Sequence, residues 1–362
     1  MSGEVCEELI FEIFTRLPPK SLLRFRSLCK SFCSYIASPG FISMHTVRSP
    51  KKVLITHETK KENGIDNFCT LYSEDQLPLF PRRAYIGITT VEFPFSKYSR
   101  CVGSCNGILC MFDCKEYSIN LWNPSIRRKL TLPDCPTSPC PQCSCGVRRV
   151  GFGFDPVTDD YKIVSLRQAT TEEPSYVYSM KKGVWCEIAS STPLNSSYYM
   201  TSWGCFVNGA LHWVIFNKLS KSDYILTFNL STDIFGIIAL PLLEPSWLCE
   251  LTTIQGSLAV VSTNGRDNCI WVMREYNDDA SWSVVFKSKE NQFQGYLQRV
   301  LQPTSNGDLF FLTLDKRFHV YDLKMKAQSR LQNLDADRSI IDMETCVESL
   351  QLLDIWTACQ GS

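Results

Sequence analysis

Apolar residues in the first part of the chain recur with the spacing of a helix. From Glu7 to Leu17 they fall at positions i, i+1, i+4, i+5 and i+8, namely Leu9, Ile10, Ile13, Phe14 and Leu17. Pro18 and Pro19 should end this helix, because proline lacks the backbone N–H that a helix needs. The same spacing predicts a short helix over 20–25 and a third over 27–37, closed by Pro39-Gly40. A unit of about 40 residues rarely buries a self-sufficient core, so we expect it to dock on another surface.

After about residue 50 the helical spacing disappears, and short runs rich in β-branched and aromatic residues alternate with turn residues. A glycine followed by a strand recurs at Gly107, Gly153, Gly209, Gly256 and Gly307, at separations of 46, 56, 47 and 51 residues. A period of roughly 50 residues with several strands per unit is typical of propeller blades, and kelch repeats are the nearest example. The spacing therefore predicts five blades.

The stretch from Val53 to Arg100 is long enough for a sixth blade, which a C-terminal strand around Val347 to Leu353 would close. The predicted fold is thus a small all-α N-terminal part with three helices, followed by an all-β propeller of about six blades.

Three N-terminal segments carry a resemblance to a known family. The runs 17–26, 28–32 and 38–42 resemble an F-box in residue type and order. Two positions depart from the usual pattern: Val5-Cys6 replaces an opening Leu-Pro pair, and Phe32 replaces a tryptophan. F-boxes bind a Skp-type adaptor and so join a cullin-based ubiquitin ligase.

The F-box resemblance implies a set of adaptor contacts on the apolar faces of the helices. These residues are Leu9, Ile13, Leu17, Pro18, Leu22, Leu23, Phe25, Leu28 and Phe32.

Five later segments, 104–110, 121–127, 151–164, 207–213 and 270–276, resemble the plant F-box-associated domain and occur in its order. That domain is a recognition platform whose targets differ between members. The expected organisation is an F-box over 1–45, a connector and probable first blade over 46–100, the F-box-associated propeller over 101–354, and a tail over 355–362.

Composition limits the function classes. Lys and Arg number 37, as do Asp and Glu, so no basic excess points to nucleic acid or an anionic membrane. The longest uncharged apolar run, 234–243, is ten residues, whereas a membrane span needs about 20. The acidic N-terminus lacks the apolar core of a signal peptide. We expect a soluble protein of the cytoplasm and/or nucleus that binds neither nucleic acid nor membrane.

Eighteen cysteines occur in the chain, and eight of them lie between Cys101 and Cys145. Cys140 and Cys143 form a Cys-x-x-Cys pair that could chelate zinc, with Cys135 and Cys145 as further candidates. The spacing from Cys143 to Cys145 is tight for tetrahedral geometry, so a loop of reduced thiols is favoured over a metal or a redox disulfide. We expect no metal and no cofactor.

Catalytic patterns are weak. His212 and His319 lie in predicted strands with no Ser or Cys placed for a triad. The pairs 159–160 and 278–279 are carboxylates in expected turns, where Asp bonds its own backbone. No catalytic residue is assigned, and we expect no enzyme activity.

Together these patterns favour the substrate-recognition subunit of a Skp-cullin-F-box ubiquitin ligase, with a Skp-family adaptor, cullin and RING subunits and an unidentified protein target as partners. A non-degradative F-box role and a propeller enzyme remain as alternatives. We expect the target to dock on one end of the propeller through irregular stretches, namely 134–148, 168–175, 190–201 and 217–222. The expected anchors are Tyr198, Tyr199, Lys218 and Lys221.

Overall fold

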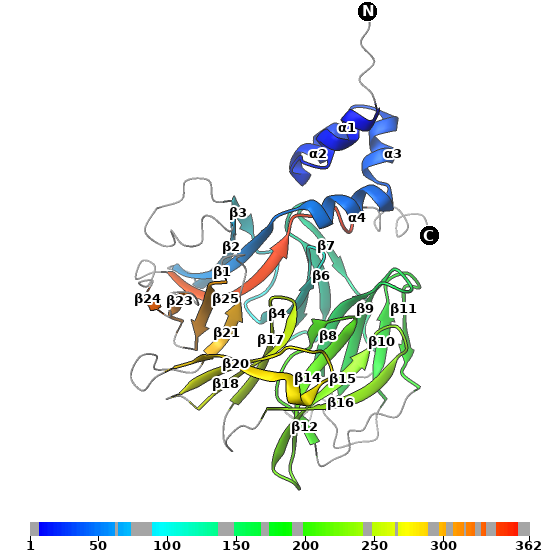
Figure 1. Ribbon diagram of the computed structural model, residues 1–362. Helices are drawn as coiled ribbons and strands as arrows, with labels where there is room; N and C mark the ends of the chain where they lie inside the picture. The colour runs from blue at the N-terminus through cyan, green and yellow to red at the C-terminus, as the bar shows by residue number, and fades with distance from the viewer. Residues whose placement is uncertain are drawn as a thin grey trace, which may run out of the picture.

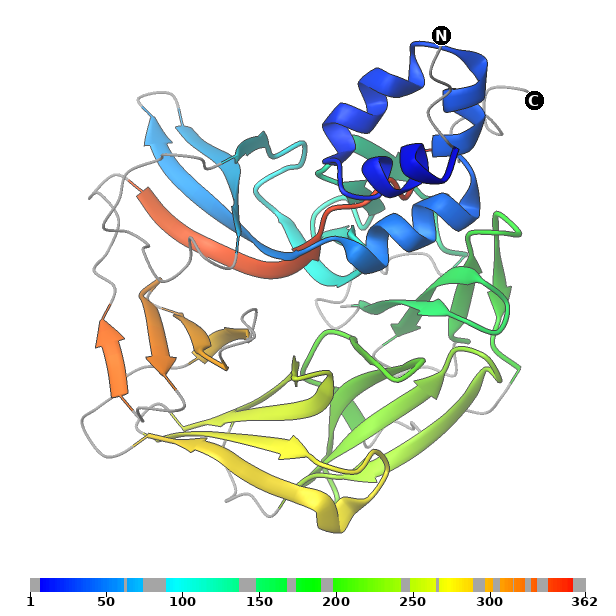
Figure 2. The same cartoon turned by 45° about the horizontal axis from the view of Figure 1, so that its top comes forward.

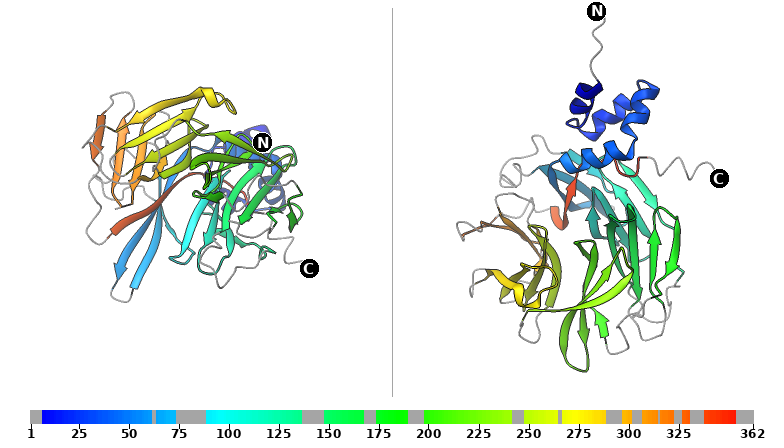
Figure 3. Two further views of the ribbon diagram at one scale, coloured as in Figure 1. Left: turned by 90° about the horizontal axis from the view of Figure 1, so that it is seen from below. Right: turned by 45° about the vertical axis from the view of Figure 1, so that its right-hand side comes forward.

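The structure is a computed structural model. It describes residues 7–61, 64–73, 89–136, 148–167, 174–189, 198–241, 248–264, 267–288, 297–301, 307–314, 316–322, 327–330 and 338–353. The helices stand on one end of a ring of strands (Figure 1; Figure 3, right).

Four helices, one more than expected, form the N-terminal part: α1 (Glu7–Phe14), α2 (Pro19–Arg26), α3 (Lys30–Ile36) and α4 (Pro39–Arg48). Pro39-Gly40 follows the end of α3 as predicted, but it also begins α4. Proline fits the first turn of a helix, where its missing N–H would have no partner. The Ser38 hydroxyl caps α4 by accepting a hydrogen bond from the Phe41 N–H at 3.4 Å.

Six antiparallel sheets surround a common axis (Figure 2), which confirms the predicted propeller of about six blades. Each sheet is a blade. The first blade contains β1 (Lys51–Lys61), β2 (Gly64–Ser73), β3 (Thr89–Glu92) and β25 (Arg338–Val347), and the second contains β4 (Ser99–Cys105), β5 (Ile108–Asp113), β6 (Ile119–Asn123) and β7 (Arg128–Thr131). The third blade contains β8 (Arg148–Asp155), β9 (Asp160–Arg167), β10 (Tyr176–Ser179) and β11 (Val184–Glu187), and the fourth contains β12 (Tyr198–Met200), β13 (Cys205–Val207), β14 (Ala210–Asn217), β15 (Ser222–Asn229) and β16 (Ile234–Ala239). The fifth blade contains β17 (Leu248–Ile254), β18 (Ser257–Thr263), β19 (Asn268–Met273) and β20 (Trp282–Lys287, after a 3-10 turn at Asp279–Ser281), and the sixth contains β21 (Leu297–Leu301), β22 (Leu309–Thr313), β23 (Phe318–Asp322) and β24 (Ala327–Arg330).

The first blade contains both ends of the propeller. β25 pairs antiparallel with β1, from Lys51 opposite Val347 to Thr59 opposite Arg338. The closing strand therefore ends at Val347, where the sequence analysis expected it to begin. The expected closing segment after Val347 has another use, described below.

Tight turns join the innermost strand of a blade to its neighbour. Cys105 pairs with Ile108 across Asn106 (φ 50°) and Gly107 (φ 81°). Two residues with positive φ suit the right-handed twist of a hairpin and favour Asn-Gly. Gly153, in contrast, lies inside β8, where an added Cβ would stand 2.4 Å from the Phe206 ring. The recurrent glycines therefore have two different roles: Gly107 forms a turn with positive φ, and Gly153 makes room for a neighbouring side chain.

Side chains from neighbouring blades meet in the spaces between them. Phe112 and Ile119 of the second blade pack with Phe152 and Ile163 of the third. Trp213 is fully buried in the next such cluster, against residues of the third blade. Each blade therefore depends on its neighbours to bury its apolar side chains.

The alternation of antiparallel strands assigns the loops to two ends of the ring. The turns 106–107 and 124–127 lie at the end that carries the helices, which we call the helix face. The turn after β14 and the connections between blades lie at the opposite end, the far face. The strands that flank all four predicted target-binding stretches end at the far face. Sequence alone could not show that these stretches share a face.

Candidate functional site

The helices present apolar side chains to solvent. Leu9 is 58% exposed, Ile13 53% and Leu28 68%. Pro18 is also exposed, whereas Leu17, Leu23, Phe25 and Phe32 are partly buried. Apolar side chains this open on so small a unit are available for contact with a partner. We call Leu9, Ile13 and Leu28 the helical surface.

Leu22 does not belong to the helical surface, although the sequence analysis placed it among the adaptor contacts. Its side chain is 0% exposed and packs with Phe14, Ile36 and Phe41 inside the helical unit. The reason is that α2 turns Leu22, like Pro19, inward to fill the small interior. Leu22 therefore supports the helices and cannot reach a partner in this conformation.

Phe25 and Phe32 serve the interior as well as the surface. The Phe14 ring lies 5.1 Å from each of the two rings, centroid to centroid. Such aromatic contacts add roughly 0.5–1.5 kcal/mol each beyond the area that they bury. Phe32, which replaces the tryptophan of the usual motif, is thus still packed as an aromatic anchor.

A C-terminal segment joins the helices to the propeller. Leu350 (0% exposed) and Leu353 (5%) pack with Phe41, Ile42 and Ile126, the last from the turn after β6. We call residues 348–353 the C-terminal clamp. These are residues that the sequence analysis had assigned to the closing strand.

Asn123 at the end of β6 fixes the C-terminal clamp in place. Its side chain is fully buried, and its amide donates hydrogen bonds to the carbonyl oxygens of Ser349 at 3.0 Å and Gln351 at 2.9 Å. Gly107 lies directly beside the start of the C-terminal clamp, since a Cβ added to this glycine would stand 2.4 Å from the Val347 carbonyl oxygen. The clamp gives the helical unit a fixed seat on the helix face.

The predicted anchors of the far face differ in their placement. Lys218 and Lys221 are exposed in the turn between β14 and β15, on either side of Leu219, which is 81% exposed. Tyr198 is partly buried and packs against the core between the third and fourth blades. The side chain of Tyr199 lies outside the described residues, as do the stretches 137–147, 168–173 and 190–197.

The cysteine cluster is described only at Cys135, which is buried. Cys140, Cys143 and Cys145 lie outside the described residues. Within the described part of the chain, no group of three His, Cys, Asp or Glu residues could hold a metal ion.

His212 is a structural residue in this fold. It is fully buried, with Nδ1 3.1 Å from the Cys205 carbonyl oxygen and Nε2 2.9 Å from the Tyr276 hydroxyl. Burial lowers the pKa of His212 to about 4. The ring is therefore neutral at physiological pH and links the fourth blade to the fifth.

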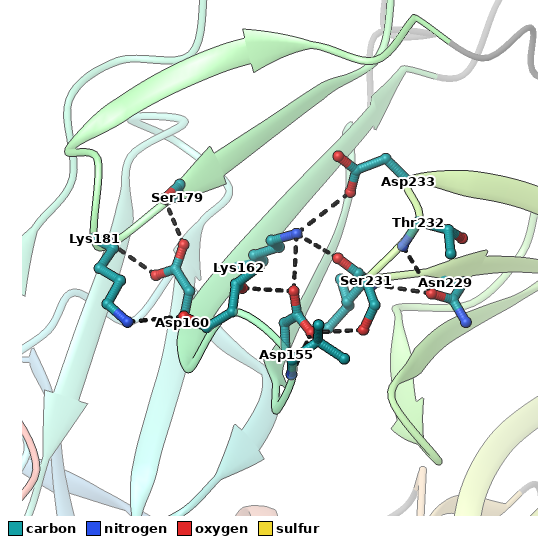
Figure 4. Close-up of polar contacts among 12 residues, drawn as sticks. Asp155, Asp160, Lys162, Ser179, Lys181, Asn229, Ser231, Thr232 and Asp233 are labelled. Carbon is teal, nitrogen blue, oxygen red and sulfur yellow. Dashed lines mark hydrogen bonds and ion pairs between the residues drawn. The ribbon is translucent and has the colours of Figure 1, made fainter.

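A polar network joins the third and fourth blades near the helix face (Figure 4). The Lys162 ammonium lies 3.2 Å from Asp155 Oδ2 and 3.5 Å from Asp233 Oδ1, and it also donates to the Leu230 carbonyl oxygen. The Ser231 hydroxyl donates to Asp155 Oδ1 at 2.6 Å. Sequence analysis missed this network; a lysine within the apolar run of β9 was the available signal.

The environment of Asp155 favours its ionised form. Burial alone raises the pKa of this carboxyl group, but hydrogen bonds from Ser231, Thr158, the Val157 N–H and Lys162 together outweigh burial and lower the pKa to about 2. The neighbouring Asp160 accepts from the Ser179 hydroxyl and the Lys181 N–H. Asp155 thus links its own turn to the neighbouring blade. Asp160, in contrast, begins β9 and binds the turn after β10, whereas the sequence analysis expected it to bond its own backbone within a turn.

Comparison with known families assigns both parts of the chain. A model of the F-box domain matches residues 4–43, and a model of the F-box associated beta propeller domain matches residues 54–345. The chain belongs to the F-box proteins with an associated propeller.

The F-box protein has many relatives in Arabidopsis thaliana. F-box protein CPR1 is 27% identical over 98% of this chain and 89% of the relative. The F-box/kelch-repeat protein At3g23880 is 28% identical, with 77% and 78% of the two chains covered. Another F-box protein is 30% identical over 68% of this chain and 65% of its own length.

Among solved structures, an oligogalacturonate lyase in complex with manganese gives a TM-score of 0.37 at 9% identity, covering 63% of the F-box protein and 74% of the lyase. Similarity at this level carries no argument about chemistry. In the described part of the F-box protein, no helix is long and apolar enough to cross a membrane.

The C-terminal clamp yields a prediction for the F-box protein. Replacing Leu350 and Leu353 together by serine should detach the helices from the propeller, because each buried leucine contributes roughly 2–5 kcal/mol. We expect proteolysis at the junction of α4 and β1 to become at least about tenfold faster. Serine at Val157 and Leu219, which are 77% and 81% exposed, is the control. Unchanged cleavage of the clamp variant would contradict the assigned role.

Proposed function

We propose that this F-box protein is the substrate-recognition subunit of a Skp-cullin-F-box ubiquitin ligase in the cytoplasm and/or nucleus. The observation that carries the proposal is the helical surface: Leu9, Ile13 and Leu28 remain exposed although α4 and the C-terminal clamp are packed on the propeller. A Skp-type adaptor covers this surface and brings the cullin and RING subunits with it.

The propeller is the proposed holder of the protein target. The strands that flank the candidate loops end on the far face, away from the helices, which supports this part of the proposal. In the described part of the far face, the turn from 217 to 222 supplies exposed apolar and basic side chains at Leu219, Lys218 and Lys221. In this arrangement the adaptor and the target bind at opposite ends without competing.

The protein itself supplies no catalytic group in this proposal. Holding the target near the ubiquitin-conjugating enzyme raises its effective concentration there, and proximity of this kind is sufficient to direct transfer. The fixed seat of the helices on the propeller supports this role, because it sets the distance and direction between the adaptor and the target.

Proximity labelling tests the proposal in plant cells. The full-length protein is compared with a variant that carries K218A, L219S and K221A, and with a matched E187Q control on another far-face strand end. We expect Skp, cullin and RING subunits to be labelled by all three proteins. A target should be labelled by wild type and E187Q but not by the triple variant.

The abundance of that target distinguishes a degradative role from the remaining alternative, a non-degradative binding role. Proteasome inhibition should raise its abundance if the protein directs degradation, whereas an unchanged abundance would indicate a non-degradative binding role. Failure to label any Skp-type adaptor would overturn the proposal as a whole.

A further inference from the structure

Exposed cations and a tyrosine gather on the far face, where the first blade leads into the second. Lys97 and Tyr98 directly precede β4, Arg100 is the second residue of that strand, and Lys115 lies in the turn after β5. All four side chains are exposed, and Tyr98 is 44% exposed. We call these four residues the basic corner. It lies at the end of the propeller opposite to the helical surface.

Asp113 at the end of β5 holds the two parts of the basic corner together. Its Oδ2 accepts hydrogen bonds from the hydroxyls of Ser96 and Ser99. Its Oδ1 accepts from the backbone N–H groups of Lys115 at 2.8 Å and Glu116 at 2.9 Å. Burial alone raises the pKa of this carboxyl group, but the hydrogen bonds outweigh burial and lower it. The charge of Asp113 is therefore engaged by hydroxyl and backbone donors and not by the exposed cations.

Arg100 is held in one orientation, yet part of its guanidinium group has no acceptor. Nη1 donates to the carbonyl oxygens of Lys97 and Ser99, both at 3.2 Å. Among the residues that the structure describes, no acceptor reaches Nε or Nη2. Nε and Nη2 form the edge of a guanidinium group that binds a carboxylate through two parallel hydrogen bonds. Arg100 thus presents an oriented carboxylate-binding edge to solvent.

Lys97 also lacks a carboxylate partner. Its ammonium group lies 5.3 Å from the centroid of the Tyr98 ring, and no carboxylate of the described chain pairs with it. Lys115, in contrast, lies 3.3 Å from Glu116. Two cations without carboxylate partners therefore flank an exposed tyrosine. Tyrosine and arginine are among the residue types that contribute most to binding energy at interfaces.

Positive charge from the third blade adds to the basic corner. Cys114, whose N–H donates to the Tyr98 carbonyl oxygen at 3.2 Å, lies between the two blades. Burial raises the pKa of the Cys114 thiol, whereas Arg100 and Arg149, the latter from β8, both lower it. Four cationic side chains (Lys97, Arg100, Lys115 and Arg149) thus oppose two carboxylates (Asp113 and Glu116), which leaves an excess of two positive charges.

The chemistry of the basic corner favours an acidic peptide over a nucleic acid. A nucleic acid is bound by a series of cations that follows several successive phosphates. Here the unpaired cations are confined to one corner, and the chain as a whole has equal numbers of basic and acidic residues. A short peptide with carboxylates on either side of an apolar residue matches two cations on either side of an exposed tyrosine.

We propose that the basic corner binds an acidic peptide segment of the target, whose carboxylates pair with Lys97 and Arg100 and whose apolar side chain lies against Tyr98. This inference rests on the proposed function, because it takes the segment to belong to the ubiquitination target, and it adds the chemistry of that target. The basic corner shares the far face with the turn from 217 to 222, so both can contact one target while the adaptor occupies the helices.

Fluorescence anisotropy of the full-length protein with a labelled peptide, Gly-Glu-Glu-Leu-Glu-Glu-Gly, tests this surface. The same peptide with glutamine at every glutamate position and a single-stranded oligouridine serve as comparison probes. We expect saturable binding of the acidic peptide that weakens as salt is added, weaker binding of oligouridine, and no binding of the glutamine peptide. K97Q/R100Q should weaken binding of the acidic peptide by at least about tenfold, because two charge-assisted contacts are lost.

The matched control is K181Q/K182Q, which removes two exposed cations from the turn between β10 and β11. That variant should bind the acidic peptide like wild type. The thermal midpoint of K97Q/R100Q is measured first. If that variant does not fold, K97Q alone takes its place, with an expected loss of at least about threefold, since the Lys97 side chain is exposed and packs only on the Tyr98 ring.

Four results would overturn the inference: no saturable binding of the acidic peptide to wild type, equal binding of the glutamine peptide, tighter binding of oligouridine, or full affinity in the Lys97 variants. Adaptor binding is measured on the same samples and should be equal in wild type and K97Q/R100Q. Adaptor binding without peptide binding overturns this inference and leaves the proposed function in place. Peptide binding without adaptor binding supports the basic corner and overturns the proposed ligase role.

Discussion

Replacing Leu9, Ile13 and Leu28 together by serine is expected to abolish stable binding of a Skp-type adaptor. The three side chains are 58%, 53% and 68% exposed, so serine removes little from the fold itself. Burying one large apolar side chain at an interface contributes roughly 1.5–3 kcal/mol, and losing three should weaken binding by at least about a hundredfold. Biolayer interferometry with purified adaptor measures this loss.

The matched control carries serine at Val157, Val184 and Leu219, three exposed apolar residues of the propeller. This variant should bind the adaptor like wild type. A thermal midpoint within a few degrees of wild type shows that the helical variant is still folded. Wild-type affinity in the Leu9/Ile13/Leu28 variant would show that the adaptor uses another surface, and the proposed function would lose its main support.

The second large effect is expected at Lys162. K162M leaves Asp155 without its ammonium partner, although the aspartate side chain is 0% exposed. Removing one partner of a buried pair is strongly destabilising, and we expect the free energy of unfolding to fall by about 3 kcal/mol. Guanidinium denaturation followed by tryptophan fluorescence measures it, because the cooperative loss of blade packing is the main transition.

K181M is the matched control for this second prediction. Lys181 lies 3.5 Å from Asp159, but both side chains are largely exposed, at 58% and 76%. Exposed pairs contribute roughly 0–1 kcal/mol, so K181M should change the free energy of unfolding only slightly. If K162M costs no more than K181M, the network in Figure 4 does not hold the blades together.

The propeller could be predicted from the sequence because its repeats are local. The turn at Asn106-Gly107 needs two residues with positive φ, and the same pattern recurs at Asn208-Gly209 and Gln255-Gly256 in the fourth and fifth blades. Gly153 shows the limit of that signal. Its position in the sequence roughly fits the repeat, but it lies inside β8, where it makes room for the Phe206 ring. The positive φ in the following turn belongs to Asp159 instead (φ 52°).

Other features depend on contacts between distant parts of the chain. Helical spacing identifies the apolar residues of the N-terminal part, but it cannot separate Leu22, which fills the interior, from Leu28, which faces solvent. The clamp joins Asn123 to Ser349, residues that no local pattern connects. The basic corner forms only when hydrogen bonds to Asp113 hold the segment before β4 against the turn after β5.

Pairing of β1 with β25 has a consequence for biosynthesis. Lys51 leaves the ribosome long before its partner Val347, by about 15–60 s at roughly 5–20 residues per second. During that interval β2 covers only one edge of β1, and the edge that β25 will occupy stays open to pairing with another chain. A premature stop codon upstream of β25 would leave the ring open and remove the C-terminal clamp, while the residues of the helical surface would still be synthesised. Such a fragment is expected to occupy the adaptor without delivering a target, and so to act against the full-length protein.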